Sequence, residues 1–260
     1  MATPLKDLVI PASLAASVYL LSLYLWRSIY PLSDLGALFL IPLCVMIFFG
    51  TLAPANDLYR ARALAAVRPS SPYLNLLSGR LRAILISTAF IITFTPVLAW
   101  LALTAHPVEI IAYIALCLLS AAISWALQIR LCRHLRPPFA RATGIAAGWL
   151  LTATPFVFII GWVNFKYSSF FESVQTLDLA SAVLLSLENL PDRRGWLAEL
   201  FSVFYATEAT KLWLAVRIEQ AGRWPGILFS LDSALVAFIV ARSFLSTVEF
   251  VRLSVGREPS

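Results

Sequence analysis

Apolar residues follow one another in six long runs along this chain of 260 residues, and arginines are concentrated between the runs. Each run is close to the roughly 20 residues that a helix needs to cross the hydrocarbon core of a bilayer. Because lipid offers no hydrogen-bond partners to the backbone, spans of this length are predicted to be helices. The pattern predicts an all-α fold: a polytopic transmembrane helix bundle in a single domain, residues 1–260. The six runs are 8–26, 35–54, 83–104, 110–129, 143–165 and 225–250, the last interrupted by Asp232 and Arg242.

Composition supports a membrane protein and argues against a nucleic-acid partner. Hydrophobic residues make up 60% of the chain, charged residues only 13%, and the mean hydropathy is +0.82. An average soluble domain carries about 25% charged residues. The net charge of +6 could indicate nucleic acid, but the arginines lie at the ends of the runs, where membrane proteins place them. The expected partner is therefore the lipid bilayer, and the loops are too short to hold a separate soluble catalytic domain.

The charges between the runs predict an orientation. Residues 55–82 and 130–141 are rich in arginine, whereas 105–109 holds a single charge, Glu109. The positive-inside rule places the two arginine-rich segments in the cytoplasm. This predicts a bacterial inner-membrane protein with a cytoplasmic N-terminus. Four aromatic residues near the outer ends of the first and third runs are expected to anchor at the membrane interface: Tyr24, Trp26, Tyr30 and Trp100.

Residues 166–224 are expected to form a helical excursion on the outer side. The apolar stretch 179–187 is too short to cross a bilayer, and 196–216 carries Glu208 and Lys211, which share a helix face at a spacing of three. Burying these charges in lipid costs more than placing the helix along the interface or letting it re-enter the membrane. The sequence therefore predicts six spans with an interfacial or re-entrant segment, and a seventh crossing stays open.

Candidate chemistry is sparse. The three cysteines are isolated and no metal-ligand spacing occurs, so neither a metal site nor a cofactor is expected. Asp232 is an ionisable residue within a span, which marks either a functional site or a helix start near the interface; with Glu208 and Lys211 it forms the predicted set of intramembrane polar residues. Gly144 and Gly148 form a GxxxG pattern, which indicates close helix packing.

Two segments and the order of the spans carry a family resemblance. Residues 59–81, YRARALAAVRPSSPYLNLLSGRL, follow the second span, and residues 190–209, LPDRRGWLAELFSVFYATEA, precede the last one. A charged helix, a Pro-Ser turn and a leucine-rich stretch with a Gly-Arg pair make the first segment similar to a loop of ABC-2 type transporters. The second segment resembles the outer re-entrant segment of the same family. The chain as a whole thus resembles the membrane subunit of these transporters.

This resemblance implies a function, partners and site residues. Residues 57–68 would be a coupling helix that docks on a separate cytoplasmic ATPase, and residues 190–216 would line the exit of the path. The chain would then be the permease subunit of an ATP-driven exporter, without enzymatic activity of its own, working as a homodimer or within a larger membrane complex. The implied partner-coupling residues are Asp57, Arg60, Arg62 and Arg68.

Two other functions are compatible with the sequence. The chain could be a non-catalytic scaffold or accessory subunit of a larger membrane complex. It could also be an intramembrane enzyme that uses Asp232 and Glu208 as acid and base on a lipid-like substrate.

Overall fold

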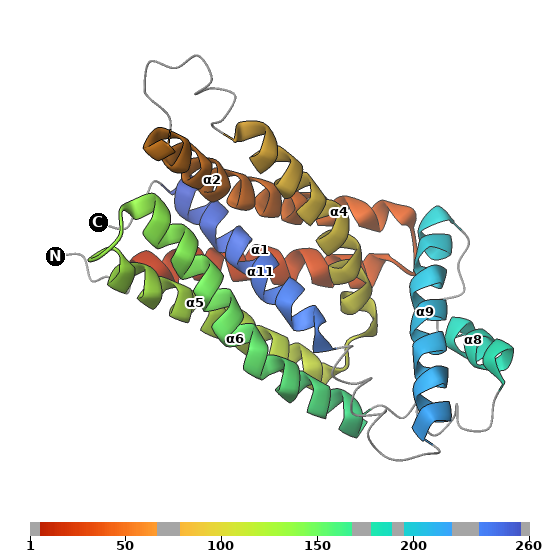
Figure 1. Ribbon diagram of the computed structural model, residues 1–260. Coiled ribbons are helices and arrows are strands. Elements are labelled where there is room, and N and C mark those ends of the chain that lie inside the picture. Colours follow the sequence, from red (N-terminus) through yellow and green to blue (C-terminus); the bar gives the residue numbers. More distant parts are fainter. Residues whose placement is uncertain (1–5, 67–78, 168–177, 189–194, 220–233, 256–260) are drawn as a thin grey trace.

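The computed structural model describes residues 6–66, 79–167, 178–188, 195–219 and 234–255, and the regular structure in these ranges is helical (Figure 1). The elements in chain order are α1 (Lys6–Ile29), the 3₁₀ helix η1 (Asp34–Leu40), α2 (Ile41–Ala66), α4 (Arg80–Thr104), α5 (Pro107–Leu131), α6 (Pro137–Tyr167), α8 (Leu179–Glu188), α9 (Trp196–Glu219) and α11 (Val236–Ser254).

Long helices that run back and forth form a bundle, in which α1 begins and α11 ends at the same end (Figure 1). That end also holds the end of α2, the start of α4 and the tight α5–α6 turn, and we call it the arginine-rich end. The opposite end holds η1, the α4–α5 turn and the start of α11, and α9 lies across it (Figure 1). We call it the α9 end.

Five described helices are long and apolar enough to cross a membrane: α1, α2 together with η1, α4, α5 and α6. Their outward faces are apolar as well, since Ile92, Ile111 and Trp162 are each more than 65% exposed. Water-exposed surfaces rarely show so many large apolar side chains. The chain is therefore an integral membrane protein.

Helix α11 lies at the centre of the bundle and packs against α1, α2, α4, α5 and α6. Every residue from Ser243 to Glu249 is buried. The helix also carries Arg242, Glu249 and Arg252, and it is not among the five helices that qualify as spans by length and composition. The most buried helix of the bundle is thus also a strongly polar one.

The second predicted span, 35–54, begins where the candidate span Asp34–Ala65 begins, but its predicted end is wrong. Its first residues form η1, whose start is capped by the Ser33 hydroxyl accepting a hydrogen bond from the backbone N–H of Leu35 at 3.1 Å. At the other end, Pro54 does not terminate α2, which continues to Ala66. Proline in a helix interior removes one hydrogen bond, and here that loss does not end the helix.

Helices α8 and α9 pack against each other, and α9 is not among the five helices that qualify as spans. Phe201 and Leu197 of α9 are buried in a cluster with Trp26, Tyr30 and Leu40. Trp26 and Tyr30 are both 0% exposed, and the Trp26 indole N–H donates to the carbonyl oxygen of Ala99 at 2.9 Å.

The prediction that these two aromatic residues anchor at the membrane interface is therefore wrong, because the α9 end covers them. Trp100 packs at the edge of the same cluster and is partly buried. Tyr24, by contrast, is 66% exposed.

Candidate functional site

A cavity of about 520 Å³ lies between α1, α4, α5 and α11, toward the α9 end. We call it the α1–α5 cavity. Small-molecule sites in proteins typically enclose about 300–1,000 Å³, so this space is large enough for one ligand. Its lining is almost entirely apolar, with Leu23, Leu98, Ile114 and Val240 among the residues that form its wall.

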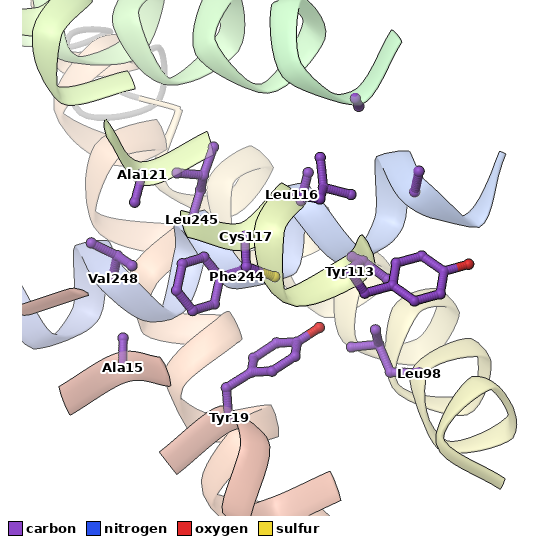
Figure 2. Close-up of a cluster of buried hydrophobic side chains, with 14 of the residues drawn as sticks. Ala15, Tyr19, Leu98, Tyr113, Leu116, Cys117, Ala121, Phe244, Leu245 and Val248 are labelled. Carbon is purple, nitrogen blue, oxygen red and sulfur yellow. The ribbon is translucent and has the colours of Figure 1, made fainter. Parts of the chain in front are cut away.

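A few polar atoms interrupt the apolar wall. Tyr19, Tyr113 and Cys117 line the cavity, and Figure 2 shows Tyr19 and Cys117 beside Phe244 of α11. The Tyr19 hydroxyl forms a hydrogen bond with the Ser243 hydroxyl at 2.9 Å, which ties α1 to α11. None of the described lining residues is a carboxylate or a histidine. The cavity therefore offers binding surface rather than an acid–base pair.

The rim of the cavity faces outward between α1 and α5. Leu20 and Tyr24 of α1 and Leu118 of α5 line the cavity, and they are 42%, 66% and 51% exposed. Side chains that line the cavity and are also exposed at the protein surface mark the place where the cavity opens. Since α1 and α5 are candidate spans, this opening lies on a surface that would contact lipid.

At the arginine-rich end, a buried carboxylate holds several helices together. Glu249 of α11 accepts hydrogen bonds from Nε and Nη2 of Arg141 on α6 at 2.8 and 2.6 Å. Its other oxygen accepts one from Arg252 Nη1 at 2.5 Å. The same nitrogen of Arg252 donates to Gln128 Oε1 of α5 at 3.0 Å.

The surroundings of these groups complete what we call the Glu249 cluster: Asp57, Trp125, Gln128, Arg141, Glu249 and Arg252. The Arg252 guanidinium lies 4.5 Å from the centre of the Trp125 ring, and Asp57 of α2 approaches Arg141 to 4.0 Å. The two arginines and two carboxylates balance in charge. Buried charges are tolerated when they are paired and hydrogen-bonded.

Glycines bring the helices very close together in the same half of the bundle. A Cβ atom on Gly144 or Gly148 of α6 would overlap Gln128 or Ser124 of α5. On α2, a Cβ atom on Gly50 would overlap the backbone carbonyl of Ser246 on α11. The GxxxG pair thus faces α5. Gly50, which no sequence pattern singled out, allows α2 to pack equally close to α11.

The structure places the predicted coupling residues at the end of α2. Asp57 is half exposed and reaches the Glu249 cluster, whereas Arg60 and Arg62 are exposed in the following turns. Residues 57–66 continue α2 as one helix rather than forming a separate one. Arg68 lies outside the described residues.

The predicted set of intramembrane polar residues is only partly described. Glu208 and Lys211 lie on α9, where the ammonium and carboxylate groups are 3.5 Å apart and both partly exposed. Asp232 lies outside the described residues. His106, which the sequence places in an outer loop, caps α5 in a capping box with Glu109.

Sequence reasoning missed Glu249 and misplaced Arg141. Arg141 was assigned to an arginine-rich loop, but it lies in α6 and points to Glu249. The signal that could have found the cluster is the pair Glu249 and Arg252, an acid and a base one helical turn apart at the end of an apolar run.

Among the described residues there is no group of three or more His, Cys, Asp or Glu side chains placed to hold a metal ion. The chain matches no protein-family model, and no curated protein or solved structure is similar to it.

Proposed function

We propose that this chain is a membrane permease subunit and that its α1–α5 cavity holds a hydrophobic, lipid-like compound that enters from the bilayer. The observation that carries the proposal is the apolar cavity of about 520 Å³, with a rim on the lipid-facing surface between α1 and α5. Binding and transfer are favoured over chemistry because the described lining contains no carboxylate or histidine.

The proposed path lies within one chain. The helices α1, α4, α5 and α11 enclose the cavity without a second copy, so a homodimer is not needed to form the binding site. In the proposed six-span topology, α11 is the sixth crossing and its charges are shielded by the other five helices. By the positive-inside rule, the arginine-rich end would face the cytoplasm and the cavity would lie toward the outer leaflet.

A binding measurement tests the proposal. The purified full chain in detergent should bind tritiated hexadecan-1-ol saturably, and Ala102→Phe should abolish this binding because Ala102 lines the cavity. Ala89→Phe is the matched control, since Ala89 lies on the same helix with an exposed side chain. Equal saturable binding by the two variants, or no saturable binding by the unchanged chain, would overturn the proposed site.

An ATPase partner is the second part of the proposal. The support is the end of α2, which presents Arg60 and Arg62 to solvent beside Asp57. Asp57 in turn contacts Arg141 of the Glu249 cluster. A push on this end of α2 would therefore reach α6 and α11 through side chains already in contact.

The double variant Arg60→Glu, Arg62→Glu should lose the ATP hydrolysis that copurifies with the tagged chain from native membranes. Arg133→Glu, Arg136→Glu is the matched control, because these arginines are exposed in the α5–α6 turn at the same end of the bundle. If no ATPase copurifies with the unchanged chain, the exporter proposal fails and the scaffold alternative is favoured.

A further inference from the structure

Arg27 is the one cation among the described residues that line the largely apolar α1–α5 cavity. Arg27 lies in the last turn of α1, at the α9 end, where Ala105 and Pro107 also line the cavity. Its Nη1 lies 3.4 Å from the carbonyl oxygen of Ala105, and its side chain is exposed. A guanidinium carries five N–H donors, and the one hydrogen bond that Arg27 makes to a residue the structure describes uses a single donor.

The charge balance around Arg27 differs from that of the arginines in the Glu249 cluster. Arg141 and Arg252 share the Glu249 carboxylate, whereas no carboxylate of the described residues lies within ion-pair distance of Arg27. The nearby start of α5 does not supply a competing anion site, because its cap is already made by His106 and Glu109.

The charge of Arg27 acts on its surroundings at the α9 end. Burial raises the pKa of the Tyr205 phenol on α9, the neighbouring Tyr30 adds to that rise, and the Arg27 cation opposes it. Arg27 is therefore close to both α9 and the cavity. Long basic side chains at the ends of membrane helices reach into the headgroup region of the bilayer. The Arg27 guanidinium would therefore lie at the level of the lipid headgroups.

We propose that the α1–α5 cavity selects amphiphiles with an anionic headgroup, a carboxylate or a phosphate, that Arg27 binds while the acyl chain fills the apolar space. This inference rests on the proposed function, because it names the class of compound that the same cavity takes. Arginine matches both headgroups in geometry, since its planar fork can donate two parallel hydrogen bonds to either. The exposed rim formed by Leu20, Tyr24 and Leu118 would let the chain enter from the side.

Three probes with the same C16 chain separate the headgroup from the tail: hexadecanoate, hexadecyl phosphate and hexadecan-1-ol. At pH 8, where the first two are ionised, the purified full chain should bind at least one of them about tenfold more tightly than the alcohol, as expected for charge-assisted hydrogen bonds. The tighter of the two charged probes identifies a fatty-acid-like or a phospholipid-like source.

Arg27→Gln should remove this preference, because the affinity for the charged probes falls about tenfold relative to that for hexadecan-1-ol. Saturable binding of hexadecan-1-ol by the variant shows that it is folded. Arg27→Lys should recover the preference in part because it keeps the charge but not the fork. Arg136→Gln, an exposed arginine at the opposite end, should behave as the unchanged chain does.

Two outcomes would overturn the inference in distinguishable ways. Equal affinity of the unchanged chain for all three probes, or an undiminished preference in Arg27→Gln, overturns the role of Arg27 alone and leaves the cavity as a binding site. Absence of saturable binding of any probe overturns both this inference and the proposed function.

Discussion

The two ends of the bundle differ in packing and in charge, although α11 contributes to both. Toward the α9 end, Val240 and Phe244 of α11 line an apolar cavity; toward the arginine-rich end, Glu249 and Arg252 of the same helix are buried in an ion cluster. Near Gly50 and Gly148 the helices pack with no room for a side chain. The bundle is therefore closely packed and ion-paired toward one end and holds a cavity toward the other.

Charge explains why the arginine-rich end is fixed. Glu249 accepts hydrogen bonds from Arg141 and Arg252 together, so moving α6 away from α11 would separate the Arg141 and Glu249 charges in a medium of low polarity. Separating these charges within a bilayer has a high free-energy cost. Near the cavity, the described contacts that hold α1 are hydrogen bonds, such as Tyr19–Ser243 and Trp26–Ala99, rather than ion pairs, so the apolar walls can separate around a ligand at lower cost.

The largest expected effect comes from removing the shared carboxylate. Glu249→Ala should lower the free energy of unfolding by about 3–5 kcal/mol, because it removes the buried carboxylate that Arg141 and Arg252 share. The measurement is the unfolding of the purified chain in mixed micelles, titrated with denaturing detergent. Glu208→Ala on α9, whose carboxylate is partly exposed, is the control and should cost about 1 kcal/mol or less. Equal effects of the two substitutions would contradict a fixed end.

A smaller effect is expected from adding bulk at each end. Gly148→Leu should destabilise the bundle by about 1–3 kcal/mol because a side chain there would overlap Ser124. Ala102→Phe adds comparable bulk where the cavity leaves room for it, and should change stability by less than about 1 kcal/mol. The exposed Ala146→Leu on α6 is the control for Gly148→Leu. If Ala102→Phe proved as costly as Gly148→Leu, the α9 end would not be hollow.

The smallest effect concerns a single hydrogen bond between α2 and α11. The hydroxyl oxygens of Thr51 and Ser246 lie 3.0 Å apart. A double-mutant cycle with Thr51→Val and Ser246→Ala should give a coupling of about 0.6 kcal/mol, as is typical of hydrogen bonds between membrane helices. A coupling as large as the effect of Glu249→Ala would mean that hydroxyl contacts, rather than the ion cluster, hold the arginine-rich end.

Much of the fold follows from the sequence, because the bilayer imposes a strong length requirement on apolar helices. Five of the six predicted spans coincide with helices that are long and apolar enough to cross. The boundary near Pro54 and the 3₁₀ form of the first turns do not follow, since the continuation of α2 and the 3₁₀ start depend on local backbone geometry rather than on hydropathy.

The site could not be predicted in the same way. Burial of Trp26 and Tyr30 depends on α9, which is distant in sequence and covers them only in three dimensions. Glu249 and Arg141 are hydrogen-bonded although they are 108 residues apart in the sequence, so no local pattern connects them. A cavity has no sequence signal either, because it arises where the side chains of four helices fail to fill the space between them.

The most direct test of the central claim is to locate a bound acyl chain. A hexadecanoate probe with a photoactivatable diazirine in its chain, added to vesicles that contain the full protein, should label residues that line the α1–α5 cavity, such as Leu98 and Cys117. Unlabelled hexadecanoate should compete for this labelling. Label confined to lipid-facing residues such as Ile92 and Phe158, with none in the cavity, would contradict the account.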